Sequence, residues 1–147
     1  MGDLEIAKEI LRGRDYSLVM VRDGRIIYAS RSHGIGGILH AIEELNCRIK
    51  GASVADKVIG KAAALLLAYS KVKDAYAVII SRNGLETLRS HGIQVDYENL
   101  VPKILDRSGR GICPFEKIAL EIDSPRLGFE ALRRRWRSLI EESKGRF

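Results

Sequence analysis

Residues 53–69 form the most apolar helix candidate in the chain, and they constrain the fold more than any other segment. Every residue from Ala62 to Ala68 is Ala or Leu. A helix that is apolar on all faces is buried between layers rather than lying on a surface. Ser53, followed three residues later by Asp56, has the form of a capping box. These features predict one buried central helix over residues 53–69.

Two lysines near the start of this predicted helix need an explanation. Lys57 and Lys61 would lie one turn apart on one face, close to a helix N-terminus, whose dipole disfavours cations. Gly60 lies between them, where Ala would favour a helix by about 1 kcal/mol. A bound anion would offset the lysine charges, and close approach of a ligand or backbone would explain the glycine. Solvated lysines and a packing glycine explain the pattern equally well.

Length and composition indicate one globular domain. The chain has 147 residues, of which 46% are hydrophobic and 30% charged, and its apolar runs are shorter than the ~20 residues that span a bilayer. The acidic N-terminus differs from a signal peptide, so we expect a cytoplasmic protein without membrane contact. Cys47 and Cys113 lack the spacing of a zinc ribbon or a disulfide framework. We expect neither a metal nor a cofactor.

The remaining segments predict a mixed sheet between helices. Strands are predicted at residues 17–21, 25–29, 75–80 and 93–97, and short helices at residues 3–12, 38–46 and 85–90. The Asp23-Gly24 pair favours a hairpin between the first two strands, and the run at residues 75–80 is typical of a strand buried in the middle of a sheet. Residues 98–105 are a further helix candidate, weakened by Pro102. This order predicts an α/β fold, a three-layer α/β/α sandwich with a mixed sheet.

Two loops supply candidate ligand-binding residues. The glycine-rich loop at residues 30–37, with His33 and Gly34, precedes a helix and can present backbone amides to a phosphate. Its glycines match neither a P-loop nor a dinucleotide fingerprint, and they serve equally well to turn the chain. Ligands of open parallel sheets bind beyond the C-terminal ends of the strands, which singles out Arg82 and Asn83. An ordinary polar turn gives the same sequence there.

Cys113 begins the most chemically distinctive tetrad, Cys-Pro-Phe-Glu. Pro114 suits the first position of a helix that ends near residue 120, so Cys113 is the cap residue and Glu116 the third helical residue. A thiol at the positive end of a helix dipole is a candidate nucleophile or redox thiol. A small buried hydrophobe beside a capping glutamate is the alternative, since the sequence places no acid or base next to the thiol.

The C-terminal segment, residues 124–147, is predicted to be a helix that packs on the domain formed by residues 1–123 or on a neighbouring subunit. It holds four of the six net positive charges of the chain. Its apolar stripe consists of Phe129, Leu132, Trp136, Leu139 and Ile140, and its basic face of Arg133, Arg134, Arg135 and Arg137. A solvated arginine face is favoured over nucleic-acid binding, because Trp136 alone is available for base stacking. The stripe is compatible with a homodimer.

Four segments resemble an uncharacterised prokaryotic family, a domain of unknown function whose fold is similar to that of cytidine deaminases. They are residues 21–28, His33-Gly34-Ile35, residues 55–64 and Cys113-Pro-Phe-Glu116, and the resemblance covers residues 4–120. It implies a cytidine-deaminase-like fold, with the arginine-rich tail outside the family.

The resemblance does not extend to the zinc site of the deaminases. Zinc deaminases hold the metal with a His or Cys at the start of the central helix and with Pro-Cys-x-x-Cys at the start of the next helix. This chain has Asp56-Lys57 and Gly60-Lys61 at the first place and Ser81-Arg82-Asn83-Gly84 at the second. His40 and Glu43 have the wrong spacing and lie on the preceding helix. The resemblance therefore implies a deaminase-like cleft without a metal.

Three functions stay open at this level. The first is binding of a small anionic, nucleotide-like ligand in the deaminase-like cleft. Its candidate residues are His33, Gly34, Asp56, Lys57, Gly60, Lys61, Arg82, Asn83 and Glu116. The second is an enzyme that uses Cys113 as nucleophile, and the third is an interaction module for nucleic acid or protein that uses the basic tail. The first function requires that Lys57, Lys61 and Arg82 converge on one cleft together with Cys113.

Overall fold

Helices and strands follow one another closely along the chain, which this computed structural model describes for residues 1–106 and 108–144. The elements are α1 (Asp3–Gly13), β1 (Leu18–Arg22), β2 (Arg25–Ser30), α2 (Gly36–Leu45), the 3-10 helix η1 (Asn46–Ile49), β3 (Ser53–Ile59), α3 (Lys61–Tyr69), β4 (Asp74–Ser81), α4 (Arg82–Ser90), β5 (Gln94–Val101), α5 (Pro114–Leu120) and α6 (Pro125–Lys144). None of the described helices has the length and apolar character needed to cross a membrane.

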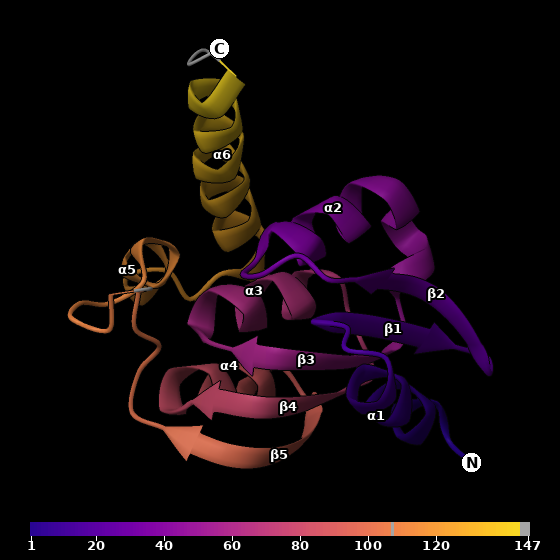
Figure 1. The fold of residues 1–147 in the computed structure, drawn as a ribbon. Helices are drawn as coiled ribbons and strands as arrows, with labels where there is room; N and C mark the ends of the chain where they lie inside the picture. Colours follow the sequence, from indigo (N-terminus) through magenta and orange to yellow (C-terminus); the bar gives the residue numbers. More distant parts are fainter. Residues whose placement is uncertain (107, 145–147) are drawn as a thin grey trace.

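The strands form one mixed sheet in the order β2-β1-β3-β4-β5 (Figure 1). β1 is antiparallel to β2 and β3, whereas β3, β4 and β5 are parallel. The predicted hairpin between β1 and β2 is confirmed, and its turn residues Asp23 and Gly24 both have positive φ, 53° and 76°. Asp3 at the start of α1 holds this turn, because its carboxylate accepts from both turn amides.

The two faces of the sheet are covered by different helices. On one face, Ala7 and Leu11 of α1 pack against a small cluster that includes the buried Tyr76 of β4. On the other face, α2, α3 and α4 contribute to the larger core. The α/β class and the three-layer sandwich with a mixed sheet are therefore confirmed.

Helix α6 packs on the outer side of α3, so that α3 is enclosed between the sheet and α6 (Figure 1). This enclosure explains why Leu65, Leu66 and Leu67 of α3 are all fully buried. Gly128 permits the close approach, since a Cβ added there would lie 3.0 Å from Leu65 Cδ1. The buried residues of α6 include Phe129, whose ring stacks on Tyr69 at the end of α3 with 4.2 Å between centroids.

The segment predicted as one central helix is a strand followed by a helix. Residues Ser53–Ile59 form β3, the middle strand of the sheet, and α3 begins only at Lys61, with Gly60 as its cap residue. Ser53 and Asp56 imitate a capping box, but Ser53 is buried in a strand that pairs on both sides, with β1 and with β4. The prediction was wrong there because tertiary pairing overrides a short local motif.

Two further predictions are corrected by the sheet. Residues 98–105 do not form a helix, because β5 continues beside β4 as far as Val101, immediately before Pro102. The strand predicted as the middle of the sheet, at residues 75–80, lies inside β4 and is one position away from the centre. Arg107, and residues 145–147 of the predicted tail, lie outside the described part of the chain.

The packing of α6 on α3 predicts that the tail is part of the folding unit. Leu132 is fully buried in this contact, whereas Leu127 on the same helix is 49% exposed. Leu132→Ala should lower the free energy of unfolding by about 2–5 kcal/mol, and Leu127→Ala, the matched control, by less than about 0.5 kcal/mol. Urea unfolding followed by circular dichroism measures both. Equal, small effects of the two substitutions would mean that α6 does not pack as described.

Candidate functional site

Lys57 lies apart from the other predicted ligand-binding residues. It belongs to β3, and its Nζ is 3.1 Å from Asp15 Oδ1, in the connection between α1 and β1. The placement on one helix face with Lys61 is therefore wrong, since only Lys61 belongs to a helix. The charge of Lys57 is balanced by a surface carboxylate of the chain itself.

Asp56 is a buried carboxyl in the middle of the sheet. It lies opposite Leu18 of β1 and Ala77 of β4, and Val58 N donates to its Oδ1 at 3.3 Å. Burial raises the pKa of Asp56 to about 7, although hydrogen bonds from the amides of Val58 and Lys57 oppose the shift. The side chain is therefore partly protonated near neutral pH.

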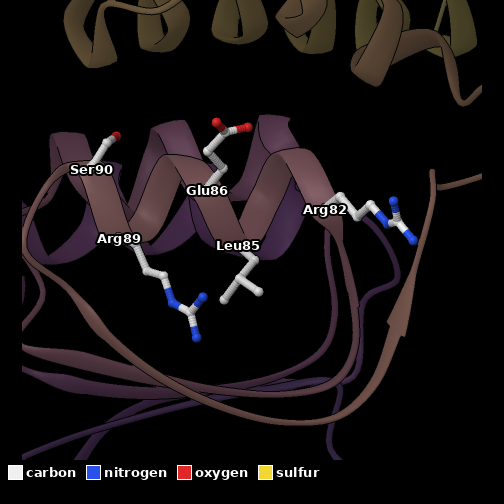
Figure 2. Close-up of a pocket in the computed structure, with 5 residues that line it drawn as sticks. All are labelled: Arg82, Leu85, Glu86, Arg89 and Ser90. Carbon is white, nitrogen blue, oxygen red and sulfur yellow. The ribbon is translucent and has the colours of Figure 1, made fainter.

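Arg82 and Asn83 begin α4 but face different surroundings. Ser81 caps this helix, since its Oγ accepts from Gly84 N at 3.0 Å. Asn83 lines a cavity of about 390 Å³, whose other walls include Lys61 and Asp123. Arg82 instead lines a groove of about 530 Å³ along α4, and its side chain points outward from the start of the helix (Figure 2).

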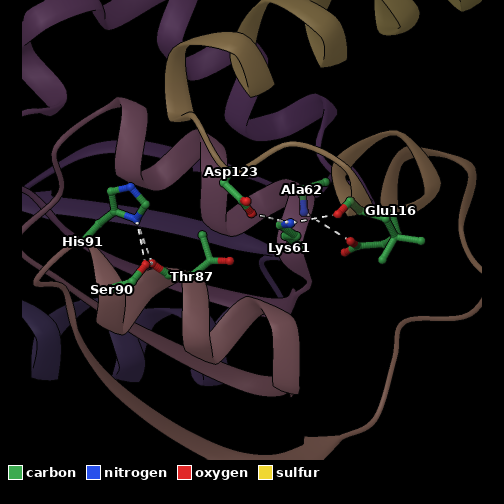
Figure 3. Close-up of polar contacts among 8 residues, drawn as sticks. Lys61, Ala62, Thr87, Ser90, His91, Glu116 and Asp123 are labelled. Carbon is green, nitrogen blue, oxygen red and sulfur yellow. Dashed lines mark hydrogen bonds and ion pairs between the residues drawn. The ribbon is translucent and has the colours of Figure 1, made fainter.

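Glu116 of α5 caps the N-terminus of α3 from a distant part of the chain. Ala62 N donates to Glu116 Oε2 at 3.2 Å, and the glutamate is 92% buried (Figure 3). Gly60 makes this contact possible, because a Cβ added at Gly60 would overlap the Glu116 carboxylate. The glycine therefore serves close approach, as the sequence indicated, but the approaching group is a side chain of the chain itself.

The Glu116 carboxylate takes the place that a bound anion would take at this helix start. Burial raises the pKa of Glu116, and the amides of Ala62 and Lys61 together with the Lys61 charge act in the opposite direction. A helix N-terminus favours a negative group through its free amides and its dipole. Since that position is filled, the start of α3 has no open anion site.

Lys61 is likewise engaged by the chain. Its Nζ donates to Leu120 O and to Asp123 Oδ1, both at 3.1 Å (Figure 3). Leu120 is the last residue of α5, and Asp123 lies in the connection between α5 and α6. Lys61 and Glu116 together hold α5 and the start of α6 against the first turn of α3. No local pattern indicated these contacts, because Asp123 is 62 residues away in the sequence.

Cys113 is the cap residue of α5, as predicted, but its thiol makes no capping hydrogen bond. Its backbone is held instead, since Cys113 N donates to Ile104 O at 3.2 Å.

The residues predicted to share one cleft do not meet in the structure. Lys57, Lys61 and Arg82 have three separate environments. Within residues 1–106 and 108–144, no group of three or more His, Cys, Asp or Glu could hold a metal ion.

The glycine-rich loop and α6 form a separate cavity at the N-terminus of α2. Its volume is about 370 Å³, and it is lined by Tyr28, Ser32, His33, Gly36, Gly37, His40 and Trp136. Tyr28 Oη lies 2.8 Å from His40 Nδ1. Gly34, with a φ of 75°, turns the chain beside it. The sequence indicated the loop, but it gave no sign that Trp136, one hundred residues later, closes this cavity.

Helix α2 starts without a side-chain cap. Its cap residue is Ile35, which offers no side-chain acceptor to the first amides. Trp136 approaches closely here, because a Cβ added at Gly36 would lie 3.0 Å from the indole Nε1. Among the predicted site residues, His33 therefore lines this cavity, whereas Lys61 and Asn83 line the cavity of about 390 Å³ beside α4.

The Glu116 contact predicts a loss of stability when the carboxylate is removed. Glu116→Ala leaves Ala62 N buried without its acceptor, which should lower the free energy of unfolding by about 1–3 kcal/mol. Glu116→Gln keeps an acceptor oxygen and should lose less. Glu121→Ala, at the exposed end of α5, is the matched control and should change little. Equal urea midpoints for Glu116→Ala and Glu121→Ala would contradict the capping role.

The buried Asp56 predicts that stability falls as the pH rises. Its folded-state pKa, about 7, is above the ordinary value of 3.8, so protonation favours the folded state. The free energy of unfolding should be highest below pH 4 and should fall by up to about 4 kcal/mol between pH 4 and 7. Asp56→Asn should remove most of this fall, while the smaller effect of Glu116, which has the same sign, remains. Parallel pH profiles of the two proteins in urea unfolding would contradict the assignment.

Comparisons with known proteins agree with this fold. The family model of a domain of unknown function (DUF1893) matches residues 6–135, so the expectation that the tail lies outside the family is wrong for residues 124–135. The crystal structure of a DUF1893 family protein from Thermotoga maritima has 30% sequence identity and a TM-score of 0.83, and the match covers 90% of this chain and 89% of that chain. The comparison with curated proteins gives no match.

More distant structures share only the fold. Two forms of Acinetobacter baumannii RibD match with 17% and 15% identity and TM-scores of 0.50 and 0.51. The matches cover 65% and 88% of this chain, but only 34% and 40% of RibD. RibD carries the cytidine-deaminase-like fold, so that predicted architecture is confirmed. The chain belongs to the DUF1893 family, a domain of unknown function with a cytidine-deaminase-like fold.

Proposed function

We propose that the protein binds a small anionic, nucleotide-like ligand in the cavity at the N-terminus of α2. The observation that carries this proposal is the meeting of an uncapped helix start, two histidines and an indole around about 370 Å³ of open space. Small-molecule sites commonly have volumes of ~300–1,000 Å³. The cavity is therefore large enough for a compact ligand of the nucleotide class.

The anionic end of the ligand would bind at the first turn of α2. The first amides of any helix have no partner within the helix, and its dipole places partial positive charge there. Gly36 and Gly37 both line the cavity, and Gly36 is only half-buried, so the helix start borders the open space. His33 lies in the loop before them and lines the same cavity. A phosphate group fits this arrangement better than a neutral group does.

The flat end of the ligand would stack on the indole of Trp136. Indole rings provide a large apolar surface for base stacking, which contributes ~1–3 kcal/mol per base. Trp136 is half-buried, and its ring lies against Gly36, next to the proposed phosphate position. Tyr28 and His40, which are paired by a hydrogen bond, line the cavity as well and can recognise the polar edge of a base.

The start of α3 is a weaker candidate for the same function. Glu116 fills its anion position and Asp123 neutralises Lys61, so a ligand would have to displace both carboxylates. The proposal therefore moves the ligand from the predicted lysines to the predicted glycine-rich loop. Four further expectations stay predictions. They are a nucleophilic Cys113, a homodimer, a cytoplasmic location, and nucleic-acid contact through Arg133, Arg134, Arg135 and Arg137.

Trp136 is the single tryptophan of the chain, so its fluorescence reports on this cavity directly. Titration with nucleoside monophosphates should change the emission in a saturable way, and the matching nucleosides and inorganic phosphate alone should bind more weakly. His33→Ala should weaken binding roughly 10- to 150-fold, which corresponds to one lost hydrogen bond to a charged group.

His91→Ala is the matched control for this titration. His91 lies at the end of α4 and lines the other cavity, with Lys61 and Asn83. This variant should bind as the unsubstituted protein does. The proposal is wrong if no nucleotide gives a saturable change, or if His33→Ala and His91→Ala weaken binding equally.

A further inference from the structure

Strand β5 forms a free edge of the sheet. It is the last strand in the order β2-β1-β3-β4-β5, and within the described part of the chain it pairs only with β4. Six of its eight residues are exposed and the other two half-buried. An edge strand carries a row of backbone N–H and C=O groups without partners, which can pair with another extended chain.

A groove runs along α4 and reaches the start of this edge. Its first part is lined by Arg82, Leu85, Glu86, Arg89 and Ser90, and its second part by Arg89 and residues 92–96, which include the first three residues of β5. Arg89 lines both parts and so connects them. The groove along α4 therefore continues to the start of β5, and we term this groove together with the exposed edge of β5 the β5 edge groove.

The β5 edge groove carries two arginines. Arg82 and Arg89 are exposed, and neither forms an ion pair with any residue in the described ranges 1–106 and 108–144. Glu86 and Asp96 also line the groove, but within the described residues neither forms an ion pair with these arginines. The Glu86 side chain points away from Leu85 and Arg89 (Figure 2), and Asp96 is paired with Tyr76, which belongs to the face of the sheet that α1 covers. Leu85, 93% buried, forms an apolar floor between the arginines.

We propose that the β5 edge groove binds an extended acidic segment of a partner protein, which adds a strand beside β5. Main-chain hydrogen bonds to the free edge would supply affinity, and carboxylates that meet Arg82 and Arg89 would supply specificity. The two arginines lie two helical turns apart, about 10 Å along the axis of α4. Acidic side chains on one face of a strand recur every ~7 Å, so alternating acidic residues can reach both arginines.

A second copy of this chain fits the groove less well. Antiparallel pairing of β5 with β5 of another copy would place both α4 helices on the same side of the extended sheet. Arg89 lies near the start of β5, and Arg82 near the end of the strand that pairs with it. Such a dimer would therefore bring Arg82 of one copy toward Arg89 of the other, and like charges would oppose it.

The test uses the full chain and a fluorescein-labelled nonapeptide that alternates Glu and Thr. Fluorescence anisotropy should show saturable binding, and replacement of every Glu by Lys in the peptide should abolish it. The double substitution Arg82→Glu with Arg89→Glu should weaken binding by about tenfold or more, since two charge pairs become repulsive. Hydrogen exchange should show protection of alternate amides of β5 when the acidic peptide is bound.

Arg133→Glu with Arg134→Glu on α6 is the matched control, because it makes the same change of charge on another helix. It should leave peptide binding within about twofold. The proposal is overturned if the acidic peptide does not bind, if both double variants weaken binding equally, or if the β5 amides gain no protection. Self-association through β5, detected as concentration-dependent protection of the same amides without peptide, would also overturn it.

Discussion

The contact of the Glu116 carboxylate with the first turn of α3 is the interaction on which the arrangement of the C-terminal half depends. Gly60 leaves the space for it, and Lys61, the next residue, binds the end of α5 and Asp123. A buried helix start needs acceptors for its free amides. The chain supplies them from residues more than fifty positions later, which fixes α5 and directs α6 across α3.

This solution has a consequence for function. In a deaminase-like fold, the starts of the inner helices are the places where amides and dipoles converge near the C-terminal ends of the parallel strands. Here the start of α3 is closed by a carboxylate and that of α4 is capped by Ser81, whereas the start of α2 has neither. For this reason the proposed anionic ligand is assigned to the start of α2, beside the indole that α6 contributes.

The sequence predicted those parts of the fold that short-range patterns determine. The hairpin turn at Asp23-Gly24, the helix after Pro114 and the apolar Ala and Leu run of α3 were all read correctly. The strand Ser53–Ile59 was read as helix because Ser and Asp three residues apart satisfy a local capping pattern, although strands on both sides decide its conformation. For the same reason the lysines were grouped wrongly, and Glu116 and Trp136 received no partners. Their partners come from distant parts of the chain, and the periodicity of residues within one segment does not reveal such contacts.

The central claim is that the start of α2, and not that of α3, is the anion-accepting end of the fold. Amide chemical shifts during a titration with adenosine monophosphate test it most directly, because each helix start has its own reporter amides. The account predicts saturable shifts at Gly36, Gly37 and the indole N–H of Trp136, with Lys61 and Ala62 unchanged. Shifts centred on Lys61 and Ala62, which would require the ligand to displace Glu116, would contradict it.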